Sequence, residues 1–178
     1  MSVIIGLDLS LTGTGCIKLQ DGRVISQQLI KTKPTGDNYM NGLLRLLEIR
    51  DKINIAEVDI AVIEGMAFMA RNTTALVQLA ALNYFIREKL YLNKIPFIIV
   101  APTSLKKFIT SHGNAKKDVM MMETYKRYHV TFSDNNLCDA YGLARIGESL
   151  LNKEVVITKI QQEVINLLTK QIVWNHQK

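Results

Sequence analysis

Three acidic residues stand where a carboxylate could take part in chemistry. Asp8 ends the apolar run Val3–Leu7, and Glu64 ends the largely apolar run Val58–Ile63. Short runs of Val, Ile and Leu bounded by turn residues are typical of strands that are buried on both faces of a sheet. Asp139 lies near the start of a helical pattern in the last third of the sequence. A buried carboxylate must be neutralised, paired or bound to a cation, so these acids become informative if they meet.

The acids can meet if the two runs are neighbouring parallel strands, because the carboxyl ends of such strands lie at one edge of a sheet. A helix N-terminus can bring Asp139 to the same edge. Three carboxylates around one space suit Mg²⁺, a hard cation that prefers oxygen ligands. Two such ions about 4 Å apart can activate a water and stabilise the leaving 3′-oxygen of a phosphodiester. The alternative is that each acid is separately solvated, with Asp8 capping the turn that follows it.

The elements that position these acids follow from hydrophobic periodicity and turn signals. Asp21-Gly22 separates two β-rich runs, which predicts a hairpin and, with the first strand, a meander of three antiparallel strands. The predicted strands are Val3–Ser10, Gly15–Leu19, Arg23–Lys31, Val58–Gly65 and Pro96–Ala101, and the predicted helices are Tyr39–Ile53, Thr73–Leu92, Leu105–Ile109, Ala115–Tyr128, Leu137–Leu151 and Thr158–Trp174. This order predicts an α/β protein with a ribonuclease H-like mixed five-stranded sheet, made of the meander plus two parallel strands and flanked by helices.

Composition narrows the class of protein. A chain of 178 residues that is 48% hydrophobic can bury one sizeable core and is short for two. The net charge of +6 favours an anionic polymer as partner. Cys16 and Cys138 are too few and too isolated for a disulfide framework or a zinc site, so we expect them to be small buried hydrophobes, and we expect His112 at the surface. With no run approaching about 18 apolar residues and no leader pattern, we expect a cytoplasmic protein without a membrane partner.

Five sequence pieces form an ordered set that spans Val3 to about Leu150. They are Ile5–Asp8 with Thr12–Gly15, Ile63-Glu64 followed by Phe68–Asn72, Pro102 with Lys106, Gly113–Lys117, and Asp139–Ala144. No single piece is specific, because D-x-x-x-T-G also occurs in sugar kinases and actin-like ATPases. The ordered set resembles the RuvC family of Holliday-junction resolvases.

This resemblance implies a homodimer that nicks two strands of a four-way DNA junction symmetrically and leaves ends that a ligase can join. It also implies magnesium or manganese as cofactor, with Asp8, Glu64 and Asp139 as ligands. We expect a nuclease domain over residues 1–151 and a C-terminal amphipathic helix within residues 152–178 that packs on the core or on the dimer partner. Whether a branch-migration motor is a further partner stays open.

The fourth metal ligand departs from the family pattern. Members usually carry Asp or His three residues before the last Asp, one helical turn away on the same face. Here that residue is Asn136, whose amide oxygen can bind a metal but carries no charge. Asp134 is the alternative, and we favour it because a site with only three acids would hold two divalent ions poorly.

A DNA-binding surface is expected beside the acids. Two lysines match the phosphate-contacting lysines of the family by flanking motif and mutual spacing, three further basic residues extend the same surface, and one aromatic residue is a candidate to stack on an unpaired base. The two matching lysines are Lys106 and Lys117. The further basic residues are Lys107, Lys116 and Arg71, and the aromatic residue is Phe68. The alternatives are that the basic residues form a solvated face and that Phe68 is a core residue.

Three other functions compete with junction resolution. A site weakened at Asn136 could leave a protein that binds junctions without cutting them. A nuclease for other branched DNA, such as forks and flaps, or for RNA would use the same residues. An actin-like phosphotransferase is suggested by the Thr-Gly turn, but it needs a duplicated domain, and this chain shows neither the length nor the repeat.

Overall fold

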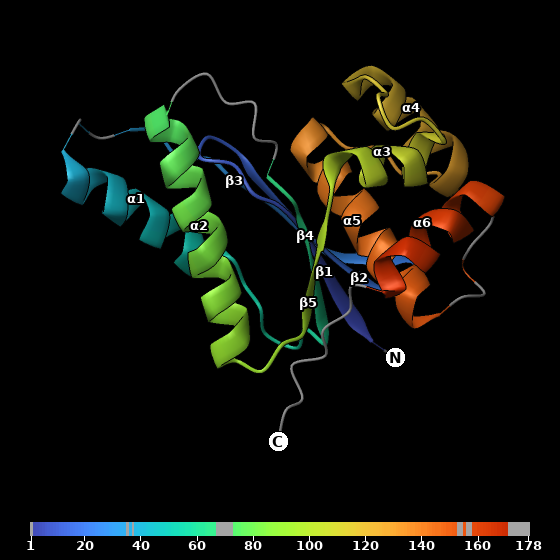
Figure 1. Ribbon diagram of the computed structural model, residues 1–178, viewed down its shortest axis with the longest axis horizontal. Helices are drawn as coiled ribbons and strands as arrows, with labels where there is room; N and C mark the ends of the chain where they lie inside the picture. The colour runs from blue at the N-terminus through green and yellow to red at the C-terminus, as the bar shows by residue number, and fades with distance from the viewer. Residues whose placement is uncertain are drawn as a thin grey trace.

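The computed structural model describes residues 2–34, 36, 38–66, 73–152, 155 and 158–170. Its centre is a five-stranded sheet in the order β3-β2-β1-β4-β5 (Figure 1). The strands are β1 (Val3–Asp8), β2 (Thr14–Gln20), β3 (Arg23–Ile30), β4 (Ile60–Glu64) and β5 (Phe97–Val100). β1 pairs with β2 in antiparallel and with β4 in parallel orientation, and β4 pairs with β5 in parallel orientation. The predicted mixed sheet is confirmed.

Six helices cover the sheet within the described ranges. They are α1 (Tyr39–Lys52), α2 (Thr73–Leu92), α3 (Pro102–Thr110), α4 (Lys117–Tyr128), α5 (Asn135–Leu151) and α6 (Lys159–Thr169). α1 and α2 lie on one face, and α3 to α6 lie on the other (Figure 1). In the described part of the chain, no helix combines the length and the apolar character that crossing a membrane requires.

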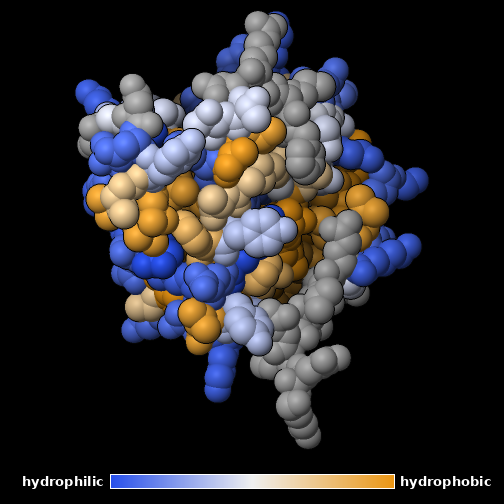
Figure 2. Space-filling model, turned by 60° about the vertical axis from the view of Figure 1, so that its left-hand side comes forward, coloured by the Kyte–Doolittle hydropathy of each residue, from blue (hydrophilic) through white to orange (hydrophobic). Residues whose placement is uncertain are grey.

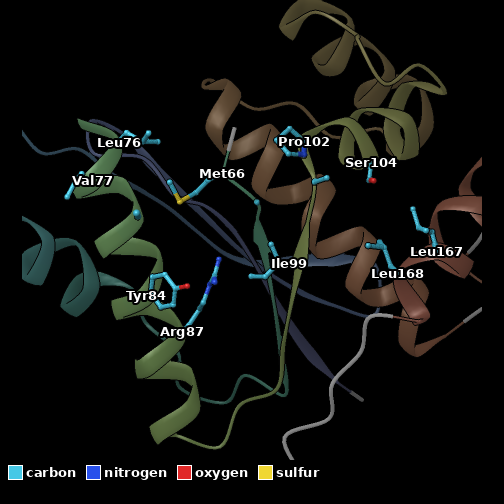
Figure 3. A pocket seen from close by; sticks show the side chains of 13 residues that line it. Met66, Leu76, Val77, Tyr84, Arg87, Ile99, Pro102, Ser104, Leu167 and Leu168 are labelled. Atoms are coloured by element: carbon cyan, nitrogen blue, oxygen red, sulfur yellow. The ribbon is translucent and has the colours of Figure 1, made fainter. Parts of the chain in front are cut away.

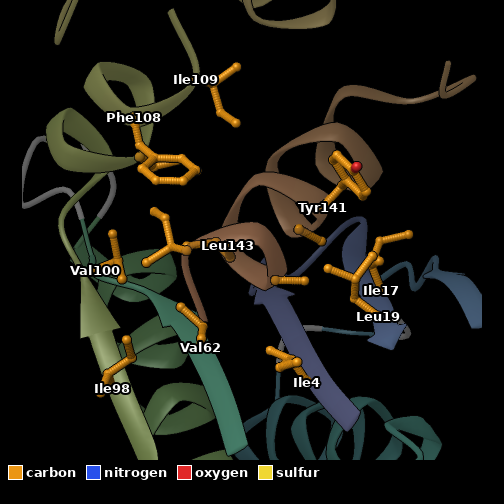
Figure 4. Close-up of a cluster of buried hydrophobic side chains, with 14 of the residues drawn as sticks. Ile4, Ile17, Leu19, Val62, Ile98, Val100, Phe108, Ile109, Tyr141 and Leu143 are labelled. Atoms are coloured by element: carbon orange, nitrogen blue, oxygen red, sulfur yellow. The ribbon is translucent and has the colours of Figure 1, made fainter. Parts of the chain in front are cut away.

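The two faces of the sheet bury two separate hydrophobic clusters. Along β1, Val3, Ile5 and Leu7 join the cluster under α1 and α2, while Ile4 joins the cluster under α3 to α6. This alternation is the period of two that a pleated strand imposes. Figure 4 shows the second cluster, in which side chains from β1, β2, β4 and β5 meet side chains from α3 and α5.

Helix α5 lies unusually close to β1 and β2. A Cβ atom added to Gly6 would stand 1.9 Å from the carbonyl oxygen of Ala140, and one added to Gly15 would stand 2.1 Å from that of Asn136. Only glycine permits this approach of backbone to backbone. The two glycines therefore fix where the first turns of α5 stand relative to the end of β1.

Several element boundaries differ from the sequence-based prediction. α3 begins at Pro102, three residues earlier than predicted, because proline is favoured in the first turn of a helix. α4 begins at Lys117 and β4 at Ile60, each two residues later than predicted. The described part of α6 ends at Thr169 and packs on the core through Val164, Ile165 and Leu168, which belong to the cluster beneath α3 to α6, while the rest of the predicted helix to Trp174 lies outside the described residues.

Candidate active site

Asp8 and Glu64 are the last residues of the adjacent parallel strands β1 and β4. Leu7 pairs with Ile63 in the register, so the two acids follow each other at the same level of the sheet. Side chains two or four residues apart in a strand point to the same face of the sheet, so Asp8 points to the same face as Ile4, and Glu64 to the same face as Val62. Both carboxylates therefore face the side of the sheet that α5 covers.

Asp139 completes the cluster from α5. Burial, followed by the charges of Glu64 and Asp139 and a hydrogen bond with Glu64, raises the pKa of Asp8 to about 9. Burial, followed by the charge of Asp139, raises the pKa of Glu64 to about 7. Burial raises the pKa of Asp139 to about 6. The three side chains thus share one space, in which Asp8 holds a proton at neutral pH when no cation is bound.

Two lysines stand beside these acids. Lys106 of α3 and Lys117 of α4 both lower the pKa values of Glu64 and Asp139, and Lys117 also lowers that of Asp8. Their effect is smaller than that of burial, because Lys117 is exposed and Lys106 is half-buried. The acids are therefore incompletely neutralised by the protein.

The two candidates for the fourth ligand have other partners in the structure. Asp134 is the N-cap of α5, and its Oδ1 accepts a hydrogen bond from the backbone N–H of Asn136 at 2.9 Å. The side chain of Asn136 donates from Nδ2 to the carbonyl oxygen of Gly13 at 2.7 Å and accepts at Oδ1 from Asn135. Asn136 thus joins α5 to the turn after β1.

The remaining basic residues take different positions. Lys107 forms an ion pair with Glu163 of α6, with 3.2 Å between Nζ and Oε2. Lys116 is exposed at the N-cap of α4. Phe68 and Arg71 lie outside the described residues.

The other side chains discussed from the sequence lie as expected. Cys16 and Cys138 are buried, and burial raises the pKa of Cys16 to about 12 and that of Cys138 to about 11, so both are thiols at neutral pH. His112 is exposed.

Gly6 and Gly15 lie in two of the pieces that resemble the family, but the sequence reasoning did not assign them their role in packing. They carry no chemistry, but they let α5 bring Asp139 to the strand ends. Glycine inside a strand pattern often marks a close approach of another backbone, and this signal could have found them.

The donor atoms of the cluster fit a hard divalent cation. All three carboxylates offer oxygen ligands, and an ion would supply the positive charge that the lysines leave incomplete. Among the residues that the structure describes, no three His, Cys, Asp or Glu side chains are arranged to hold a metal ion as they stand. Ion binding at these acids would require the proton on Asp8 to leave.

A chain with this sheet and this cluster of acids at the ends of its central strands is a ribonuclease H-like protein. Residues 4–145 match the family model described as "Crossover junction endodeoxyribonuclease RuvC", and the chain belongs to that family. A comparison with curated proteins finds no significant match.

Two solved structures of Thermus thermophilus RuvC support the fold, and a third structure has a lower similarity. RuvC of Thermus thermophilus in complex with Holliday junction substrate is 15% identical, with a TM-score of 0.64 over 81% of this chain and 91% of that one. Another T. thermophilus RuvC structure is 16% identical, with a TM-score of 0.62 over 80% and 90% of the two chains. The Fowlpox virus resolvase in complex with Holliday junction DNA is 14% identical, with a TM-score of 0.47 over 84% of this chain and 99% of that one.

Proposed function

We propose that the protein is a structure-selective endonuclease that resolves four-way DNA junctions by paired, symmetric nicks. The observation that carries the proposal is the cluster of Asp8, Glu64 and Asp139 beside two lysines, in a chain of the RuvC family. An acidic cluster alone would repel DNA, whereas the lysines attract the phosphates next to the scissile bond. Forks, flaps and RNA remain alternative substrates, and binding without cleavage remains the alternative activity.

The proposed cofactor is Mg²⁺, with Mn²⁺ as a substitute and two ions per site. Asp8, Glu64 and Asp139 would hold the ions, with Asp134 as the fourth acid. Bound ions would supply a Lewis acid that activates water and stabilises the leaving oxygen. The residues of this chain contribute the negative charge that retains the ions, while Lys106 and Lys117 hold the phosphate backbone.

A panel of synthetic substrates tests the proposal. We expect magnesium-dependent, paired nicks in a four-way junction, mapped to symmetric positions on two strands, and much slower cleavage of a fork, a flap and a linear duplex of the same sequence. Junction binding without nicking in magnesium or manganese would favour the non-cleaving alternative. Equal cleavage of all branched substrates would show that the substrate is branched DNA in general and not the four-way junction in particular.

The fourth-ligand proposal gives a prediction at Asp134. Its Oδ1 caps α5, which leaves Oδ2 as a second acceptor for a metal. Asp134→Asn keeps a good N-cap residue and removes the charge, so we expect a strong loss of nicking, partly restored at high magnesium, with an unchanged melting temperature. Asn136→Ala is the comparison variant, and we expect it to have a milder effect on nicking. Normal nicking by Asp134→Asn would leave Asp134 with a capping role only.

The lysine proposal gives a prediction about salt. Lys106→Ala and Lys117→Ala should each weaken junction binding and lower the slope of log K against log salt by about one unit, because each variant loses one phosphate contact. Binding is measured without divalent ions so that cleavage does not interfere. Lys126→Ala is the control, because Lys126 is an exposed lysine of α4 that pairs with Glu123. Unchanged slopes for both test variants would place the DNA elsewhere.

The proposed homodimer has a candidate surface on α2. Val77, Tyr84 and Tyr91 follow each other at intervals of seven residues and are 62%, 68% and 64% exposed. Beside them, an apolar groove of about 700 Å³ runs between α2 and α6 over β5 (Figure 3). Figure 2 shows apolar side chains gathered around a hollow on the side of the molecule that carries α2. A second copy would cover this surface and place two active sites for two nicks.

The dimer surface is tested by placing charge on it. Val77→Lys with Tyr84→Lys should give a folded monomer by light scattering. Such a monomer should nick single strands without the coordinated second cut. Ile25→Lys is the control, because Ile25 is a half-exposed apolar residue of β3, on a different element from this surface. A dimer that survives the double substitution would show that the copies associate elsewhere.

A further inference from the structure

A polar pocket opens beside the turn that follows β1, the strand that ends in Asp8. It has a volume of about 550 Å³ and lies between α1, the first turn of α2 and the turn after β1. Its polar lining residues are Thr12, Asn38, Asn41, Arg45, Thr74 and Gln78. Arg45 is the one charged side chain among the described residues that line it. The pocket is therefore positive and rich in neutral hydrogen-bonding groups.

Arg45 is a buried cation that has only neutral partners in the described part of the chain. It is 8% exposed. Its Nε donates to Thr32 Oγ1 at 2.9 Å, and its Nη2 donates to the carbonyl oxygens of Leu11 and Thr32. Within the described ranges, no acidic side chain forms an ion pair with it. Guanidinium does not lose its charge, so this side chain stays cationic without a compensating anion.

The surroundings of Arg45 suit a phosphate. The hydroxyl and amide side chains of the lining donate to phosphate oxygens as readily as they accept from other donors. The positive end of the α2 dipole points to the pocket through Thr74. The residues Leu11 and Thr12 follow Asp8 on the same turn, so a DNA strand that reaches the acids passes near the pocket.

We propose that this pocket binds one phosphate of the DNA backbone and so holds a second segment of the branched substrate, away from the scissile bond. The proposal rests on the function proposed above. It extends the DNA-contacting surface from α3 and α4, on one face of the sheet, to α1 and α2 on the other. A branched substrate presents backbone on both sides of its crossover, which a linear duplex does not.

Two variants place a negative charge in the pocket without removing Arg45. Gln78→Glu and Thr74→Glu should each weaken binding of a synthetic four-way junction by about tenfold in EDTA and lower the salt slope by about one unit. We expect both variants to fold, because the new carboxylate lies in the same pocket as the buried guanidinium of Arg45. Gln27→Glu, the same change at an exposed residue of β3, is the control and should bind as the unsubstituted protein does.

A second measurement uses inorganic phosphate as the probe and needs no DNA. Phosphate should shift the NMR signals of the Arg45 Nε–H and the Gln78 amide in the unsubstituted protein, and should not do so in Gln78→Glu. If phosphate binds the unsubstituted protein but Gln78→Glu and Thr74→Glu bind the junction with unchanged affinity, the pocket does not hold DNA. It is then a site for free phosphate or a nucleotide. No phosphate shift together with unchanged junction affinity would overturn the site itself. If the unsubstituted chain does not bind the junction, the proposed function fails, and the phosphate titration alone decides whether the pocket holds an anion.

Discussion

Glu64→Gln is expected to abolish magnesium-dependent nicking, with a loss on the order of a thousandfold or more, while junction binding stays close to normal. The substitution keeps the shape of the side chain and removes one of three charges that would retain the metal. It leaves Lys106 and Lys117 in place, so the phosphate contacts proposed for them should persist. Nicking rates on a four-way junction and binding in EDTA measure the two effects separately.

The structure adds a stability control to this experiment. Burial, followed by the charge of Asp139, raises the pKa of Glu64, so these two carboxylates repel each other when no cation is present. The amide of Gln removes part of that repulsion, and we expect the melting temperature without magnesium to be unchanged or higher. Glu88→Gln, at an exposed acid of α2, is the matched control and should nick normally. Near-normal nicking by Glu64→Gln would refute the proposed metal site.

Gly6→Ala is expected to destabilise the protein by about 3 kcal/mol, one of the largest effects of a single methyl group in this fold. The new Cβ would stand 1.9 Å from the carbonyl oxygen of Ala140 and 2.6 Å from the backbone nitrogen of Ala144. Neither atom can move without moving α5. The helix must therefore shift away from β1 and carry Asp139 with it, so we also expect reduced nicking below the melting transition.

Gly42→Ala is the matched control for this prediction. Gly42 lies in α1, and its nearest neighbour would be the end of the flexible Gln78 side chain, which can turn away. Alanine is the better helix former by about 1 kcal/mol, so the melting temperature should rise slightly. An unchanged melting temperature for Gly6→Ala would show that α5 does not hold its close position in solution.

The sheet was predictable because its signals are local. Asp21-Gly22 between two β-rich runs fixed the hairpin, and both residues have the positive φ angles that the turn requires. The short, unalternating run that ends in Asp8 indicated a strand buried on both faces, and the structure places β1 at the centre of the sheet. Helix starts were less certain, because a residue such as Pro102 is compatible with both the end of a strand and the first turn of a helix.

The meeting of the acids was predictable for a different reason. Parallel pairing of β1 and β4 brings their last residues to one edge whatever the side-chain details are. The fate of Asp134 and Asn136 was not predictable, because both capping and metal binding favour the same residue types at a helix start. The pairing of Lys107 with Glu163 depends on where α6 packs, and spacing along the chain does not carry that information.

The close packing of α5 on β1 also bears on when the acid cluster can form during synthesis of the chain. β1 leaves the ribosome first among the strands, and α5 follows only after every strand has been made. Until then Gly6 and Gly15 have no α5 to pack against, and Asp8 and Glu64 lack the third acid, Asp139. Contacts between such distant segments form late and slowly in folding. A growing or prematurely ended chain therefore lacks the complete set of acids, and we expect the nuclease activity proposed above to appear only after α5 has packed on β1.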